Sequence, residues 1–369
     1  IYDDKEIVYA NKENYNRYNA ISSDEYTNVI DYKGHGYSKY KDIQINRFRN
    51  RIDCHEGIGV YFKNTKTKRI WSSFESDKVI FTQGKEEFIK EEENIKTKVK
   101  VFLTPEEPAE IRQIEIKNEG ILTNTIETYM YIEPLLSRLQ DDIAHPCYNN
   151  MFLKFKYLKD ENTVICSRKI KDKEIFLGVK VIKKDENEIE VELDKEKFIG
   201  RNSIIPKAIL ESNNFSNEEI ETVEPIIAFK TKVDIGPQEE EKINFIIQVS
   251  ENQEELLSTL REMNSEKIET ISELAKAKSE EEIKFLEING EQIENNQKLL
   301  GHLIEKDIPK TINTCFNIEN VWKFGISGDN PIILLEIKNI EELYVLEELL
   351  NTIEFFNVKK IKIDLCILN

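Results

Sequence analysis

A histidine with carboxylates close by is the pattern in this chain that most suggests acid/base chemistry. The segment DDIAHPCYNN (141–150) places His145, one of only four histidines, directly before a proline and after two aspartates. Such a histidine could act as a general base if Asp141 or Asp142 oriented its ring. No local motif supplies a nucleophilic serine or cysteine, so the pattern favours a histidine that organises a turn.

The segment GHGYSKYKDIQINRFRNRID (34–53) holds the second concentration of reactive side chains. Its arginines occupy alternate positions, so on a β-strand they would project from one face. Cations on one face of an acidic protein need partners. The segment could therefore form an anion or sugar site, or an arginine–carboxylate network between two sheets. Buried arginine is commonly paired, which favours the network. The residues predicted for it are Arg47, Arg49, Arg51 and Asp53.

Aromatic rings beside polar groups are a further candidate site, because a sugar-binding cleft needs rings that face solvent. Trp71, in RIWSSF, could stack on a sugar or fill the interface between two sheets, and the second is the commoner position of a strand tryptophan. The residues considered for carbohydrate binding are Tyr37, Tyr40, Trp71, His145, Tyr148 and Asn149.

The charge balance of the chain limits its partners. With 70 acidic and 52 basic residues, the formal net charge is −18. Such a surface repels nucleic-acid phosphates and anionic lipid headgroups, whereas a neutral glycan meets no such repulsion. No apolar run approaches the length of a membrane span. We therefore expect no nucleic-acid partner and no direct membrane contact.

Cysteine usage indicates a reducing compartment. The five cysteines are an odd number and form no CxxC pair, so the sequence predicts neither a disulfide framework nor a zinc site. We expect reduced thiols in a cytoplasmic protein without a metal or a cofactor.

Residues 1–250 show the pattern of antiparallel β-structure. Short runs alternate apolar and polar residues between polar turns, as in AEIRQIEIKN (109–118) and TNTIETYMYIE (123–133). Further strands are predicted at MFLKFKYL (151–158), TVICSRKI (163–170), EIFLGVKVIK (174–183) and EIEVEL (188–193). Because no helical crossovers separate these runs, the pattern favours a large antiparallel sandwich.

Residues 251–310 have helical spacing instead. Leu256 and Leu260 share one face of the first predicted helix, and Ser250 and Asn252 are its candidate N-caps. The outer face is charged, so we interpret this stretch as a helical linker on the protein surface.

Residues 311–369 show a third pattern. A strand (330–337), an amphipathic helix (339–356) and a second strand (358–369) together predict a parallel, right-handed βαβ unit. The chain begins at Ile1 and ends within a predicted strand. We therefore expect it to be a segment of a longer protein.

Several segments, in this order, resemble the supersandwich domain of glycoside hydrolase family 94, as found in cyclic β-1,2-glucan synthases and 1,2-β-oligoglucan phosphorylases. They are the glycine- and arginine-rich segment 34–53, RIWSSF, DDIAHPCYNNMFLKF, FIGRNSIIP and VWKFGISGDNPIILLEI. The resemblance extends over residues 30–369. Three positions depart from the family pattern: Asn50 replaces an acidic residue, Met151 a leucine, and Phe355 or Phe356 a tryptophan. We therefore transfer no catalytic residue.

The resemblance implies a galactose-mutarotase-like sandwich that supports a catalytic (α/α) barrel, and nothing in this chain resembles the barrel. We expect a non-catalytic, carbohydrate-associated domain of a β-1,2-glucan synthase or phosphorylase. Its partners would be the barrel, a second sandwich and a β-glucan chain, on the cytoplasmic side of an inner-membrane protein. Two alternatives stay open: a purely structural interdomain module, and a self-contained carbohydrate-active enzyme that uses His145 with Asp141 or Asp142.

Overall fold

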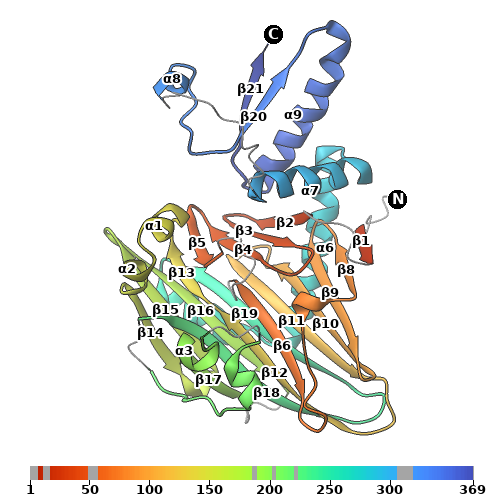
Figure 1. Ribbon diagram of the computed structural model, residues 1–369, viewed down its shortest axis with the longest axis vertical. Coiled ribbons are helices and arrows are strands. Elements are labelled where there is room, and N and C mark those ends of the chain that lie inside the picture. The colour runs from red at the N-terminus through yellow and green to blue at the C-terminus, as the bar shows by residue number, and fades with distance from the viewer. Residues whose placement is uncertain are drawn as a thin grey trace.

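Antiparallel sheets form the larger part of the computed structural model, which describes residues 7–10, 17–48, 57–184, 189–201, 205–219, 223–305 and 319–368. The largest sheet has nine strands in the order β1-β8-β9-β10-β11-β19-β16-β15-β14 (Figure 1). These strands are β1 (Ile7–Ala10), β8 (Lys78–Phe81), β9 (Lys85–Glu92), β10 (Ile95–Leu103), β11 (Ala109–Asn118), β19 (Glu240–Ser250), β16 (Lys173–Lys183), β15 (Thr163–Ile170) and β14 (Leu153–Leu158).

A five-stranded antiparallel sheet packs against the nine-stranded one. Its order is β17-β18-β12-β6-β7, formed by β17 (Ile189–Asp194), β18 (Pro225–Ile235), β12 (Asn124–Ile132), β6 (Ile58–Asn64) and β7 (Ile70–Ser72). The main core lies between them and includes Val99, Ile114, Met130 and Phe245. Along β10 buried and half-buried residues alternate from Ile95 to Val101, since successive side chains of a strand point to opposite faces. The predicted antiparallel sandwich is confirmed.

A second five-stranded sheet crosses the upper end of the sandwich in Figure 1. Its order is β13-β5-β4-β3-β2, formed by β13 (Pro134–Ser137), β5 (Ile43–Asn46), β4 (Gly36–Tyr40), β3 (Tyr26–Asp31) and β2 (Tyr18–Ser23). Short helical segments connect the strands elsewhere: α1 (Leu139–Ala144), α2 (Pro146–Asn150), α3 (Lys195–Phe198), α4 (Lys207–Glu211), and the 3-10 turns η1 (Ser73–Glu75) and η2 (Lys159–Glu161).

Three longer helices follow the strands: α5 (Gln253–Glu262), α6 (Ser265–Leu286) and α7 (Gly290–Glu305). The side chain of Asn252 accepts hydrogen bonds from two backbone amides of the first turn of α5, which is the N-cap arrangement that the sequence predicted. Leu256 and Leu260 of α5 pack with Ile246 on the outer face of the nine-stranded sheet. The helices therefore extend the core. The division of the chain at residues 250 and 310 stays a prediction.

The C-terminal elements are α8 (Glu319–Trp322), β20 (Ile332–Glu336), η4 (Ile340–Glu342), α9 (Leu343–Val358) and β21 (Asp364–Leu368). β20 and β21 pair in parallel, as predicted. Phe355 and Phe356, at the end of α9, are buried with Leu300 of α7 and Tyr18 of β2, so this unit is attached to the sandwich by apolar contact. Among the helices described here, none is both long and apolar enough to cross a membrane.

Candidate functional site

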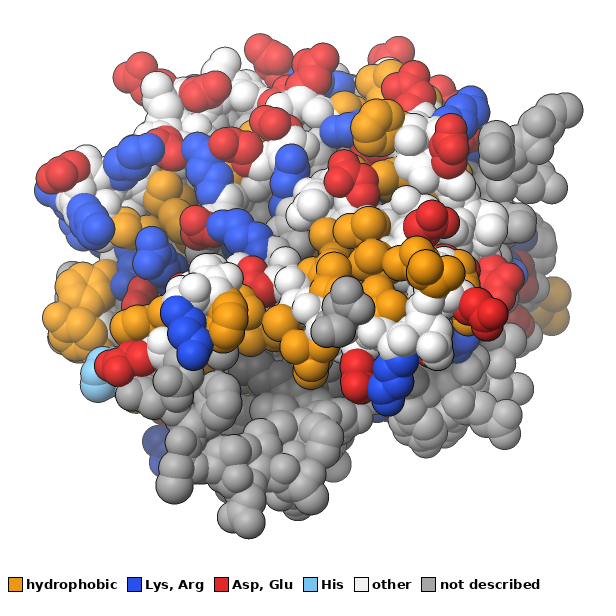
Figure 2. Space-filling model, turned by 90° about the horizontal axis from the view of Figure 1, so that it is seen from above, with side chains coloured by type: hydrophobic (Ala, Val, Ile, Leu, Met, Phe, Trp, Pro, Cys, Tyr) orange, Lys and Arg blue, Asp and Glu red, His pale blue; other side chains and the backbone are white. Residues whose placement is uncertain are grey.

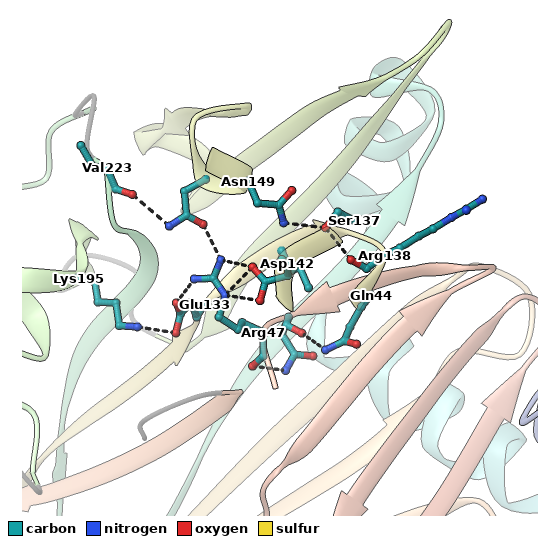
Figure 3. Close-up of polar contacts among 12 residues, drawn as sticks. Gln44, Arg47, Glu133, Ser137, Arg138, Asp142, Asn149, Lys195 and Val223 are labelled. Carbon is teal, nitrogen blue, oxygen red and sulfur yellow. Dashed lines mark hydrogen bonds and ion pairs between the residues drawn. The ribbon is translucent and has the colours of Figure 1, made fainter. Parts of the chain in front are cut away.

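A buried arginine organises the end of the sandwich that carries α1 and α2. Arg47 is 5% exposed and follows β5 directly. Its guanidinium lies between the carboxylates of Glu133 and Asp142, with Nη2 donating to Oδ1 of Asp142 over 2.8 Å (Figure 3). Nη2 also donates to Oδ1 of Asn150 over 2.7 Å, and Lys195 donates to Oε2 of Glu133 over 2.8 Å. We call these five residues the Arg47 network.

The Arg47 network joins segments that are distant in sequence. Burial disfavours the charged guanidinium, but the Glu133 and Asp142 carboxylates outweigh burial and raise the pKa of Arg47. The carboxylates lie 86 and 95 positions from the arginine, so no local sequence signal could identify them. The predicted partners Arg49, Arg51 and Asp53 lie outside the described residues.

The Arg47 network uses one of the two aspartates considered as partners of His145. Asp142 is buried and both of its carboxylate oxygens accept from Arg47, whereas Asp141 is exposed. His145 is exposed and forms the junction of the two helices: its backbone amide donates to Asp141 and its carbonyl accepts from Asn149. This placement agrees with a histidine that organises a turn.

Two of the aromatic candidates are buried and a third is half-buried. Trp71 is 2% exposed, stacks on Phe62 at 5.7 Å between ring centroids, and donates from Nε1 to Oγ1 of Thr97 over 3.1 Å. Tyr40 is also buried. Tyr37 is half-buried against the Phe48 ring, and burial raises its pKa to about 12. Trp71 and Tyr40 lie in the main core and offer no free face to a sugar, whereas Tyr37 packs half-buried against a second apolar cluster.

Two of the remaining candidates, His145 and Tyr148, are exposed on the segment that carries α1 and α2. Tyr148 is 61% exposed and its ring meets Phe152 edge-on, with 4.9 Å between centroids. The Arg168 guanidinium lies 5.5 Å from the Phe152 centroid and donates to the backbone carbonyl of Asn149. Burial, only partly offset by Asp141, lowers the pKa of Arg168. We define the α1–α2 platform as Ile143, His145, Tyr148, Met151 and Phe152.

Buried polar contacts hold the α1–α2 platform from below. Asn149 is 4% exposed, and its Nδ2 donates to Oγ of Ser137 over 2.8 Å (Figure 3). Asn150 is bound to Arg47 on one side and donates to the carbonyl of Val223 on the other. Asn149, considered above as a sugar ligand, is thus used within the protein. Phe152 lies within the segment DDIAHPCYNNMFLKF that carries the family resemblance, but no pattern singled it out, and Arg168 lies in a predicted strand without a recognisable motif.

The outer face of the β17–β7 sheet offers no second aromatic site in the part of the chain that the structure describes. Tyr61, Tyr129 and Tyr131 project from it, but Phe198 and Phe215 cover them. The described residues also contain no group of three or more histidine, cysteine, aspartate or glutamate side chains placed to hold a metal ion. The α1–α2 platform is therefore the candidate site.

Comparison with known proteins places this arrangement in a family. The family described as glycosyl hydrolase 94, supersandwich domain, matches residues 5–266. The chain belongs to this family. The resemblance inferred from the sequence segments is thereby confirmed.

Individual relatives are distant. Cyclic beta-(1,2)-glucan synthase NdvB of Rhizobium meliloti (strain 1021) is 22% identical over 372 residues, covering 95% of this chain but only 13% of that protein. A bacterial glucoamylase complexed with acarbose is similar over 81% of this chain and 44% of its own, with 10% identity and a TM-score of 0.46. A galactose mutarotase related enzyme from Lactobacillus acidophilus matches over 63% and 97%, with 8% identity and a TM-score of 0.38.

Proposed function

We propose that this supersandwich domain is a non-catalytic part of a protein that forms or phosphorolyses β-1,2-glucan. In this proposal it supports a catalytic (α/α) barrel together with a second sandwich, and it holds the glucan chain on the α1–α2 platform. Family membership and the similarity to a glucan synthase support the carbohydrate context. The exposed Tyr148 ring, fixed above a buried network, is the observation that carries the binding role.

The geometry of the α1–α2 platform suits a weakly held, neutral ligand. A tyrosine ring offers a large contact area at a low cost in conformational entropy. Tyr148 is braced by Phe152, and the helix that carries it is fixed by Asn149 and Asn150. A surface fixed before binding loses less conformational entropy on complex formation. The acidic surface does not repel an uncharged glucan.

A purely structural interdomain role is the second candidate. Ile143 is 60% exposed and Met151 is 71% exposed on the same platform. Aliphatic side chains of this kind favour contact with another protein surface over contact with a sugar hydroxyl. A self-contained enzyme has less support, because Asp142, one of the two aspartates considered as its acid/base partner, is bound to Arg47.

Calorimetric titration with linear β-1,2-glucan oligosaccharides, with inorganic phosphate present and product release monitored, tests these alternatives. We expect binding without turnover, and a Tyr148→Ala variant that binds about tenfold more weakly. Tyr344→Ala is the matched control, because Tyr344 is 62% exposed but lies on α9. Absence of binding by the unaltered chain would favour the structural role, and turnover would favour the enzyme.

A further inference from the structure

A small pocket lies between the nine-stranded sheet and α6. Its walls come from β2, the turn between β8 and β9, the end of β10 and one side of α6. The turn is seated closely on the helix, because a Cβ atom on Gly84 would lie only 2.7 Å from the carbonyl oxygen of Ala275. The pocket has a volume of about 20 Å³, which is enough for a water molecule and far less than a sugar ring requires.

The Gln83 side chain lines this pocket without a hydrogen-bond partner in the protein. The residue is 4% exposed, and both Nε2 and Oε1 are unpartnered. Among the described residues it is the one side chain with two such buried atoms. Burial of an amide is costly unless its donor and its acceptor are satisfied. The pocket is the space beside this amide, so a ligand in the pocket can supply the bond.

A lysine of α6 supplies a second polar group. Nζ of Lys278 donates to Oγ of Ser23 over 3.2 Å, which is its one hydrogen bond among the described residues. An ammonium group carries three donors, so others remain for a ligand in the pocket that Lys278 lines. A buried water molecule typically makes about three hydrogen bonds to groups of this kind. Gln83 and Lys278 thus offer the donors and the acceptor that a water molecule needs.

The charges around the pocket favour a neutral ligand over an ion. Its lining holds one lysine, Lys278, and one glutamate, Glu282, and the glutamate is already paired with Lys359 at 2.6 Å. Figure 2 views the molecule from the end that carries the C-terminal α/β unit, and acidic and basic side chains are interspersed over this end. No local excess of one sign of charge would therefore draw an ion into so small a space.

We propose that the pocket binds a water molecule that bridges the Gln83 amide to the Lys278 ammonium group. The water links the β8–β9 turn to α6 through two side chains that form no direct hydrogen bond with each other. Because the backbone carbonyl of Gln83 accepts from Lys359, the water site adjoins the attachment of the C-terminal α/β unit. This inference does not depend on sugar binding, since the α1–α2 platform is built from other residues.

Crystal structures of the unaltered chain and of two variants test the water site directly. We expect electron density for a water molecule about 2.7–3.2 Å from both the Gln83 amide and Nζ of Lys278. Gln83→Met keeps the length of the side chain and should remove this density, whereas Gln140→Met, at an exposed glutamine on α1, should retain it. A dry pocket in the unaltered chain, or a Gln83 amide bonded directly to a protein group, would overturn the proposal. Anomalous scattering at this position after a bromide soak would also overturn it, because the occupant would then be an anion.

A double-mutant cycle tests the bridge in solution. Residues that share one hydrogen-bond network have coupled effects on stability, whereas the effects of independent residues add. We expect the unfolding equilibrium constant of the Gln83→Met, Lys278→Met double variant to differ about threefold from the value that the single variants predict. The same cycle with Lys276→Met, at an exposed lysine of α6, should be additive. Additive effects of Gln83 and Lys278, or equal coupling in both cycles, would overturn the bridge.

Discussion

The ammonium group of Lys359 lies 2.6 Å from Oε2 of Glu282, although the two residues are 77 positions apart. The Lys359 side chain is 1% exposed. It follows α9, while Glu282 belongs to α6 on the sandwich. Oγ of Ser22 donates to the carbonyl of Val358, and Oγ1 of Thr27 donates to the carbonyl of Lys359. A buried ion pair and two strand hydroxyls thus attach the C-terminal α/β unit to the rest of the chain.

Replacement of Lys359 by methionine should loosen this attachment. The change leaves Glu282 without its cation and the backbone carbonyl of Gln83 without its donor, so we expect a loss of about 3 kcal/mol in the free energy of unfolding. Hydrogen exchange along α9 should accelerate as well. Lys360→Met is the matched control because Lys360 is exposed. Equal urea midpoints for the two variants would show that the buried pair does not hold the unit.

The fold was largely predictable because strand alternation is a local signal. The runs predicted at 109–118 and 163–170 coincide with β11 and β15, and the predicted strand–helix–strand unit forms with parallel pairing. Each of these predictions rests on neighbouring residues whose side chains report which face of an element is buried.

The polar contacts were less predictable because they depend on distant residues. Lys359 lies in a lysine-rich run that resembles a solvated surface, and nothing local indicates its pairing with Glu282. Arg47 was expected to be paired, but its partners are distant in sequence: Glu133 lies between β12 and β13, and Asp142 lies on α1. The exposure of Trp71 could not be deduced, because a tryptophan in a strand can face the core or the solvent. Only the packing of the sheets decides between these two positions.

Replacement of Arg47 should be among the most damaging changes at the platform end. Arg47→Met leaves the buried Glu133 and Asp142 carboxylates without their guanidinium, so we expect about 3–5 kcal/mol of destabilisation. The control is Arg69→Met, which breaks a two-bond pair with Glu92 on the surface and should have a far smaller effect because solvent screens that pair. Urea denaturation of both variants measures the difference. Similar losses in the two variants would mean that burial of the Arg47 network adds nothing to the free energy of unfolding.

The two tryptophans should behave oppositely. Trp71→Ala opens a large cavity between the sheets, so we expect a loss of about 3–5 kcal/mol, whereas Trp322 is 55% exposed and should tolerate the same change. Fluorescence separates them further. A Trp322→Phe variant, which retains only Trp71, should emit at short wavelength and resist acrylamide quenching, and a Trp71→Phe variant should do the reverse. Free quenching of Trp71 would contradict its placement in the core.

The stability of the protein should carry a pH dependence that originates at Glu86. Its carboxyl is fully buried, and Oε1 accepts from Nδ2 of Asn19 over 3.1 Å. Burial, and to a smaller extent the Glu110 carboxylate, raises the pKa of Glu86 well above its ordinary value of 4.5. The hydrogen bond from Asn19 lowers this pKa but does not outweigh burial. The folded protein therefore keeps this proton at pH values where the unfolded chain has released it.

Because the native state then binds more protons than the unfolded state, the free energy of unfolding falls as pH rises. The contribution of Glu86 to the free energy of unfolding is complete below its ordinary pKa. It is lost as pH rises from the ordinary pKa to the raised pKa, at about 1.4 kcal/mol for each pH unit. The Glu86→Gln substitution keeps the shape of the side chain but removes the titrating proton. We expect it to match the unaltered chain near pH 5 and to exceed it in stability at pH 8, measured by urea unfolding. A stability difference that stays constant between these pH values would rule out Glu86 as the origin.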